Sequence, residues 1–261
     1  MTMKSTKITR LTSVLGVLFA CIIMQNSAQA MAVSYVFLDN LVQSETLEYK
    51  DTTDTYTAKV SAWATTGADI GFGPTIETAI AHEMTNGLGV CNNNEGGYDT
   101  CITKNNRPAI GNSGEYEWIL VMLPEVSKID SFTIFPDGDS KRHVTYFTGW
   151  LDPLAETDLT GLTVADFSAD RSLGGLGLTQ YNVDNGKDTT PVTINLATTP
   201  AFIGGGTGDV WGNAILIGAS IDQGGAQVVL NSISTTIPLP AGVWLFISAI
   251  GALAARRKLS S

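Results

Sequence analysis

Two aspartates separated by one glycine are the residues of this sequence best suited to hold a metal ion. Asp137-Gly138-Asp139 stands between two β-type runs, with Ser140 next. Calcium takes about six to eight oxygen ligands, and a D-x-D loop supplies carboxylate oxygens at short spacing. Tight turns also use Asp and Gly, so ordinary turn chemistry is the alternative. The sequence predicts calcium at Asp137 and Asp139, but no EF-hand, because no acid occupies the twelfth position from either.

Four tryptophans could provide a surface for carbohydrate, because flat aromatic faces stack on sugar rings. Trp63, Trp118 and Trp211 lie within apolar runs, so core packing is the ordinary interpretation for them. Trp150 stands at the end of a β-type run and is the best candidate for exposure, with core packing as its alternative. The sequence therefore favours Trp150 as the residue that stacks on a glycan.

Enzyme motifs are largely missing. No G-x-S-x-G elbow occurs, and the chain has only two histidines, His82 and His143. A zinc helix starting at His82 would need its second histidine at Asn86. Glu115 and Glu117 would share one face of a strand, with their Cα atoms about 7 Å apart. This spacing is compatible with the two carboxylates of a glycosidase, but it is also found on many solvent-exposed strand edges. We therefore predict that the protein is not an enzyme, and a secreted hydrolase is the least favoured alternative.

The elements that must position these residues are predicted to be strands. Gly, Thr, Asn and Asp separate short β-rich runs, and the run Tyr56–Ala64 alternates as a half-buried strand does. One helix is expected over Ile76–Met84, with Thr75 as its N-cap. Many strands joined by turns predict an all-β protein with a single jelly-roll-like β-sandwich. The expected strands are Val33–Leu38, Tyr56–Ala64, Tyr116–Leu123, Ser131–Phe135, His143–Trp150, Val192–Leu196, Ala214–Ala219 and Gln227–Ile233.

Charge and cysteine content favour an exported protein. The chain has 15 basic and 25 acidic residues; its two ends hold six of the basic ones and no acid, which leaves a net charge of −16 on residues 31–234. Such a surface repels nucleic acid and anionic lipid. Cys91 and Cys101 flank a polar loop, and in an oxidising compartment they are expected to form a disulfide, with a metal pair or a nucleophile as alternatives.

The first 30 residues have the three parts of a secretory signal peptide. Three basic residues come first, Leu11–Met24 is mostly apolar, and Ala28-Gln29-Ala30 offers a cleavage site before Met31. An uncleaved membrane anchor is one alternative. A lipoprotein is another, because the residues before Cys21 loosely match a lipobox. We therefore expect export through the Sec translocon and a mature chain starting near Met31.

The last residues predict a membrane anchor. Residues 237–255 contain no charge, and a helix from Pro238 to Ala255 would be about 27 Å long, just enough to cross a bilayer. The basic residues Arg256, Arg257 and Lys258 would remain in the cytoplasm. The predicted organisation is therefore a signal peptide over 1–30, a β-sandwich over 31–234 and an anchor segment over 235–261.

This tail resembles the sorting segment of PEP-CTERM proteins, an exported bacterial family. The resemblance rests on PLPAGVWLF, with Pro238, Pro240 and Trp244, followed by an apolar helix and the basic triplet. It departs from the family motif in having Leu239 where Pro-Glu-Pro has glutamate. The resemblance implies an exosortase-type transpeptidase as a partner, a Gram-negative host that makes exopolysaccharide, and delivery to the cell surface or matrix.

Residues 31–234 are similar to a recurring ectodomain of PEP-CTERM proteins, which implies a β-sandwich and no established catalytic residues. The similarity rests on GLGVCNNNEG, YEWILVMLPEVSKIDSFTI, HVTYFTGW and GNAILIGA. We therefore expect a non-catalytic structural or interaction protein linked to exopolysaccharide or biofilm. A calcium-assisted glycan-binding module is the alternative.

Overall fold

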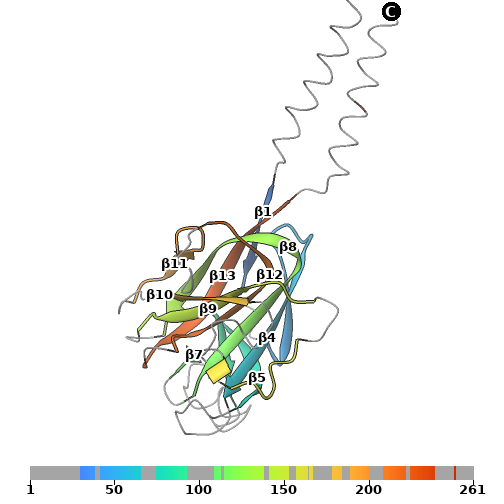
Figure 1. Ribbon diagram of the computed structural model, residues 1–261. Helices are drawn as coiled ribbons and strands as arrows, with labels where there is room; N and C mark the ends of the chain where they lie inside the picture. The colour runs from blue at the N-terminus through green and yellow to red at the C-terminus, as the bar shows by residue number, and fades with distance from the viewer. Residues whose placement is uncertain are drawn as a thin grey trace, which may run out of the picture. The chain divides into compact units, whose positions relative to one another are not determined.

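The protein folds as an all-β, sandwich-like unit, seen in a computed structural model (Figure 1). Residues Ala32–Thr236 form one compact unit. The structure describes residues 30–38, 42–65, 75–92, 109–112, 115–137, 141–152, 157–163, 165–166, 178–183, 189–199, 208–221, 224–238 and 250. The all-β, sandwich-like architecture expected from the sequence is confirmed, while the jelly-roll connectivity stays a prediction.

Thirteen strands are found in the part of the chain that the structure describes. They are β1 Met31–Val36, β2 Gln43–Ser44, β3 Thr46–Lys50, β4 Thr57–Thr65, β5 Ile76–Met84, β6 Gly87–Cys91, β7 Ile110–Gly111, β8 Glu117–Pro136, β9 Val144–Gly149, β10 Leu178–Val183, β11 Val192–Asn195, β12 Val210–Ala219 and β13 Gln227–Ile237.

The thirteen described strands belong to one sheet, and one long strand, β8, joins its two halves. The strands follow the order β1-β13-β6-β5-β4-β8-β12-β9-β10, with β2, β3, β7 and β11 pairing at the side. β4 pairs with the first half of β8, and β11 and β13 pair with its second half. β12 pairs with both halves, along residues 118–122 and again along residues 127–129. All of these pairs are antiparallel. β8 therefore connects the β4–β12 region to the β13 region through one continuous backbone.

The length of β8 corrects the expectation of two separate strands at Tyr116–Leu123 and Ser131–Phe135. Its 20 residues run through Pro124 without a turn. The pairing with β4 ends at Met122, and the pairing with β12 moves directly from Met122 to Ser127. Pro124 therefore falls in a bulge, where its missing N–H removes no ladder hydrogen bond.

The helix expected over Ile76–Met84 is wrong, because these residues form strand β5. Two neighbours hold β5 on its two edges: Ala79 lies opposite Ala62 of β4, and Ala81 lies opposite Val90 of β6. Ala79 and Ala81 are buried. The helix propensity of Ala and Glu is worth only tenths of a kcal/mol per residue, so pairing on both edges overrides it.

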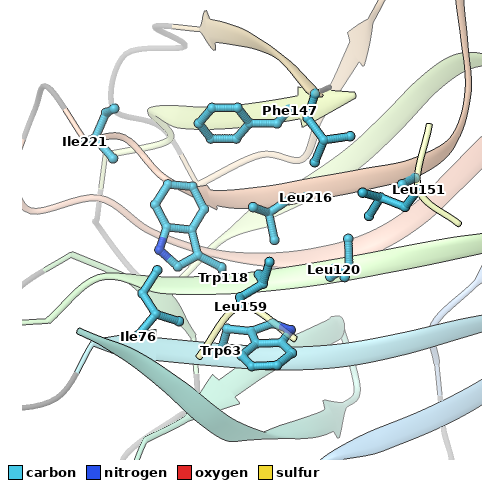
Figure 2. Close-up of a cluster of buried hydrophobic side chains, with 11 residues drawn as sticks. Trp63, Ile76, Trp118, Leu120, Phe147, Leu151, Leu159, Leu216 and Ile221 are labelled. Atoms are coloured by element: carbon cyan, nitrogen blue, oxygen red, sulfur yellow. The ribbon is translucent and has the colours of Figure 1, made fainter. Parts of the chain in front are cut away.

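A cluster of large apolar side chains covers one face of β4, β8, β12 and β9. Figure 2 shows Trp63, Trp118, Leu120, Leu216 and Phe147 within it. The rings of Trp118 and Phe147 lie 5.9 Å apart. Gly218 of β12 makes room for the indole, since a Cβ there would lie 2.1 Å from the Trp118 ring. The core positions expected for Trp63 and Trp118 are confirmed, at 4% and 0% exposure.

A second aromatic group, built on Tyr146 of β9, connects β9 to the second half of β8. Tyr146 contacts Phe132 edge to face, with ring centroids 5.0 Å apart. Its other neighbour is Tyr181 of β10, stacked at 4.8 Å. All three side chains are buried. Since Phe147 points into the cluster of Figure 2, alternation along β9 places Tyr146 on the opposite side of the sheet.

The predicted signal peptide and most of the predicted sorting segment lie outside the described residues. β13 ends at Ile237, directly before Pro238. Pro240, Trp244, Arg256, Arg257 and Lys258 lie in the part that is not described. Among the residues that are described, no helix has both the length and the apolar character needed to cross a membrane.

Candidate functional site

A groove of about 670 Å³ lies on the sheet face formed by β3, β4, β5 and β8. Strand β4 supplies its centre through Thr57, Lys59, Ser61 and Trp63, which share one face because side chains alternate along a strand. Ser61 lies between Thr46 of β3 and Leu120 of β8 in the pairing registers. The groove is therefore built from strands that are far apart in the sequence and adjacent in the sheet.

The loop 157–163 forms one wall of this groove. Leu159 is 1% exposed and belongs to the apolar cluster with Trp63 and Trp118, which fixes the loop to the sheet (Figure 2). The N–H of Ile76 donates to the Leu162 carbonyl at 2.7 Å, and the N–H of Gly161 donates back to the Ile76 carbonyl at 3.0 Å. Apolar contacts and backbone hydrogen bonds thus hold the loop 157–163 against the sheet.

The groove combines polar groups of several kinds with apolar side chains and one largely buried indole, that of Trp63. Hydroxyls of Ser61 and Thr78 and the ammonium group of Lys59 line it, and the indole N–H of Trp63 donates to the Ser61 hydroxyl at 3.0 Å. Asp158 lies on its rim. Hydrogen bonds from the side chain and the backbone N–H of Thr160 hold the pKa of Asp158 below its ordinary value. This mixture suits a ligand rich in hydroxyl groups.

Sequence reasoning did not find the groove, although one signal for it was present. The alternation in Tyr56–Ala64 sets Thr57, Lys59 and Ser61 on the polar face of the strand. No sequence pattern indicates that Thr78 and Asp158 lie beside that face. Thr78 fell inside the expected helix, and Asp158 lies in a loop whose position depends on the burial of Leu159.

Two tryptophans that do not line the groove are exposed. Trp150 is 53% exposed, as its place at a strand end suggested, and its role in stacking on a glycan stays a prediction. Trp211 is 49% exposed, so the core position expected for it is wrong. Trp211 lies opposite Lys128 in the register, and Lys128 forms an ion pair with Asp209 at 2.7 Å. These charged neighbours keep the start of β12 in solvent.

The backbone around the two exposed tryptophans is closely packed. Gly212 of β12 approaches Gly149 of β9 so closely that a Cβ on Gly212 would lie 2.1 Å from the Gly149 carbonyl oxygen. The buried side chain of Asn213 accepts from the Leu151 N–H at 2.8 Å and donates to the Leu151 carbonyl at 2.7 Å. Trp150 therefore lies between two fixed residues, Gly149 and Leu151.

The structure leaves the calcium prediction untested. Asp137 directly follows β8, and its N–H donates to the Gln227 carbonyl at 3.0 Å. Asp139 lies outside the described residues. Within the described ranges, no group of three or more His, Cys, Asp and Glu side chains could hold a metal ion together. Calcium at Asp137 and Asp139 stays a prediction.

Glu117, considered above as one of a pair of glycosidase carboxylates, is engaged in holding the fold. It is 5% exposed, and its two oxygens accept from the Asn92 amide at 2.9 Å and from the Gly111 N–H at 2.7 Å. Both histidines are buried as well, and burial lowers the pKa of His82. The hydrogen bonds of Glu117 with Asn92 and Gly111 make it a structural residue that connects three segments.

Cys91 ends strand β6 and is 5% exposed. Its expected partner Cys101 lies outside the described residues. The bridge between Cys91 and Cys101 therefore stays a prediction.

Comparison with known proteins gives no family and a weak structural similarity. No protein-family model matches the chain, and no curated protein matches it. Among solved structures, it is similar to the family 11 carbohydrate-binding module from Clostridium thermocellum, solved in complex with a β-1,3-1,4-mixed-linked tetrasaccharide. The identity is 13% and the TM-score 0.29, over 78% of this chain and 95% of that chain. A likeness of this degree carries no argument about what this protein binds.

Proposed function

We propose that the protein is a non-catalytic polysaccharide-binding protein of the bacterial cell surface, and that the groove over β4 and β8 receives the sugar chain. The single observation that carries this proposal is the groove itself, with hydroxyl and charged groups over the edge of an indole. Ligand pockets of about 300–1,000 Å³ with a few polar groups among apolar ones are typical binding sites. The groove, at about 670 Å³, lies within that range.

The chemistry of the lining favours a carbohydrate over an apolar ligand. Ser61, Thr78 and Thr57 can each donate and accept, as sugar hydroxyls do, and Lys59 and Asp158 add a charged donor and a charged acceptor. A hydroxyl-rich chain can exchange its water contacts for these groups without leaving them unpaired. A purely apolar ligand would bury them without partners, at a cost in free energy.

The location proposed for the protein comes from its sequence. The predicted signal peptide and the PEP-CTERM-like tail support export, anchoring in the inner membrane and later handling by an exosortase-type enzyme. The net charge of −16 on residues 31–234 suits a soluble extracellular unit. A protein that binds exopolysaccharide would then act where that polymer is secreted.

Binding is tested with the full chain and a panel of neutral, amino-sugar and uronic-acid polysaccharides, in calcium and in EDTA. We expect at least one polysaccharide to bind, and Thr78→Trp to weaken it by about tenfold or more because an indole would fill the groove. Thr78 is exposed on β5, so this change removes no core contact. Calorimetric titration measures both affinities. Loss of binding in EDTA would support the calcium-assisted form of the proposal.

The matched control is Thr193→Trp, the same change at an exposed position of β11 outside the groove. It should leave the affinity unchanged. Equal weakening by both variants would point to a general effect of the added indole. If no polysaccharide binds the wild-type chain, or Thr78→Trp binds as well as wild type, the groove is not the binding site.

Export is tested by fractionating a Gram-negative host that makes exopolysaccharide and carries an exosortase. We expect the protein in the surface or matrix fraction with its N-terminus at Met31. A variant with glutamine at positions 256, 257 and 258 should be sorted less efficiently, because the basic residues hold the tail in the cytoplasm. Immunoblots of the fractions and N-terminal sequencing provide the readout. Retention of the wild type in the cytoplasm with residues 1–30 intact would rule out this part of the proposal.

A further inference from the structure

We infer that the groove selects a polysaccharide with free amino groups, and that the carboxylates of Glu45 and Asp158 bind its ammonium groups. This inference rests on the proposed function and deepens it, because it names the class of sugar that the groove receives. The positive charge distinguishes such a chain from neutral and from acidic polysaccharides.

The charged side chains that line the groove carry more negative than positive charge. Glu45 and Asp158 are acidic, and Lys59 is the one basic residue of the lining. Among the described residues, the ion pairs join Lys50 to Asp54 and Lys128 to Asp130 and Asp209, so neither acid of the groove has a basic partner there. Their charge therefore remains for a ligand.

The lysine of the groove has an acidic neighbour within the protein. Glu48 of β3 lies directly opposite Lys59 of β4 in the antiparallel register. Side chains at directly opposed positions share one face of the sheet with their Cβ atoms about 5 Å apart, and opposite charges there attract each other. The ammonium group of Lys59 is thus balanced by a carboxylate of the sheet, which leaves the net charge of the groove negative.

The two acids of the groove approach its centre from different elements. Glu45 directly precedes Thr46, which lies opposite Ser61 at the centre of the groove. Asp158 directly precedes Leu159, whose side chain belongs to the apolar cluster on the same face (Figure 2). One carboxylate therefore comes from the start of β3 and the other from the loop 157–163, and a ligand over Ser61 would meet both.

This lining suits an ammonium group better than a metal ion. Calcium takes about six to eight oxygen ligands. Within the described ranges, no group of three or more His, Cys, Asp and Glu side chains could hold a metal together. An ammonium group needs only acceptors for its three N–H donors, and carboxylates and the hydroxyl of Ser61 are acceptors of this kind. Hydrogen bonds between charged partners are also stronger than those between neutral ones.

Asp158 keeps its negative charge under the conditions in which an amino sugar is positively charged. Hydrogen bonds from the side chain and the backbone N–H of Thr160 hold the pKa of Asp158 below its ordinary value. The carboxylate is therefore ionised in mildly acidic solution, where free sugar amines are protonated. Residues 31–234 also carry a net charge of −16, which attracts a cationic chain and repels a polyuronate.

The test compares three β-1,4-linked hexasaccharides that differ only at carbon 2, those of glucosamine, N-acetylglucosamine and glucose. The full chain is titrated with each by calorimetry in mildly acidic buffer of low ionic strength. We expect the glucosamine hexasaccharide to bind most tightly, and added salt to weaken its binding. Asp158→Asn and Glu45→Gln should each weaken it by about two- to fivefold, and Lys59→Gln should strengthen it by a similar factor. Asparagine can still accept from the Thr160 N–H, so the loop is preserved.

Asp209→Asn is the matched control, because it removes an exposed carboxylate that does not line the groove. It should bind the glucosamine hexasaccharide as the wild type does. Equal weakening by Asp209→Asn and Asp158→Asn, or binding that Thr78→Trp leaves intact, would indicate a general attraction to the acidic surface and would overturn the inference.

The remaining outcomes separate this inference from the proposed function. Tighter binding of the glucose or N-acetylglucosamine hexasaccharide, blocked by Thr78→Trp, would overturn the selection of amino groups and preserve the groove as a polysaccharide site. If none of the three hexasaccharides binds, the inference is overturned, and the wider polysaccharide panel decides whether the proposed function stands.

Discussion

Replacing Trp118 with alanine is expected to lower the free energy of unfolding by about 3–5 kcal/mol. The indole is fully buried, contacts Phe147, and fills the space that Gly218 leaves open on β12. Its removal would leave a cavity whose walls belong to three paired strands and cannot close easily. Single domains are stable by about 5–15 kcal/mol, so the variant would retain only part of its stability. Denaturant unfolding followed by circular dichroism measures the change.

Trp211→Ala is the matched control for this prediction. The same side chain is removed, but from a position that is 49% exposed, so the free energy of unfolding should change by less than about 1 kcal/mol. Similar losses in the two variants would contradict the assignment of Trp118 to the core and of Trp211 to the surface.

Replacing Asn213 with alanine is expected to cost about 1–3 kcal/mol for each of the two backbone groups that it leaves unpaired. Asn213 is 1% exposed, and its amide holds both the N–H and the carbonyl of Leu151 in a buried environment. Water cannot readily replace these bonds, so the segment 150–152 that follows β9 should loosen. Chemical unfolding gives the total loss, and hydrogen exchange at the Leu151 amide locates it.

Asn231→Ala serves as the comparison, because the Asn231 amide donates to the Asn86 carbonyl at 3.2 Å in an exposed position. Its loss should be below about 1 kcal/mol, since water can take the place of the bond. A Leu151 amide that stays protected from exchange in Asn213→Ala would show that the Asn213 side chain does not hold the segment after β9.

The sequence predicted those strands whose burial leaves a local pattern. In the first part of β4 exposed and buried residues alternate, and the bounds of the strand differ from the expected Tyr56–Ala64 by only one residue at each end. β5 left no such pattern. It is paired on both edges, and its Ala and Glu residues imitate a helix. The two runs of β8 were recognised, but the bulge that lets Pro124 remain inside a strand depends on β12 and β4.

The candidate site was less predictable because it depends on registers. The groove brings Thr46, Ser61 and Leu120 side by side, although Ser61 and Leu120 are 59 positions apart in the numbering. No local pattern encodes that neighbourhood. Trp150 was singled out from its place at a strand end. Trp211 was misjudged because the apolar run after it suggested burial, whereas the strand begins in solvent beside Lys128 and Asp209.

The last strand of the sheet completes pairings that begin near the start of the chain. β13 pairs with β1, β6, β7 and β8, and β8 in turn needs β4 and β12. Such long-range pairings give a high contact order, and domains of this kind fold in about milliseconds to seconds. The polypeptide therefore acquires its native structure only after residue 237 has been made, so folding follows synthesis rather than accompanying it.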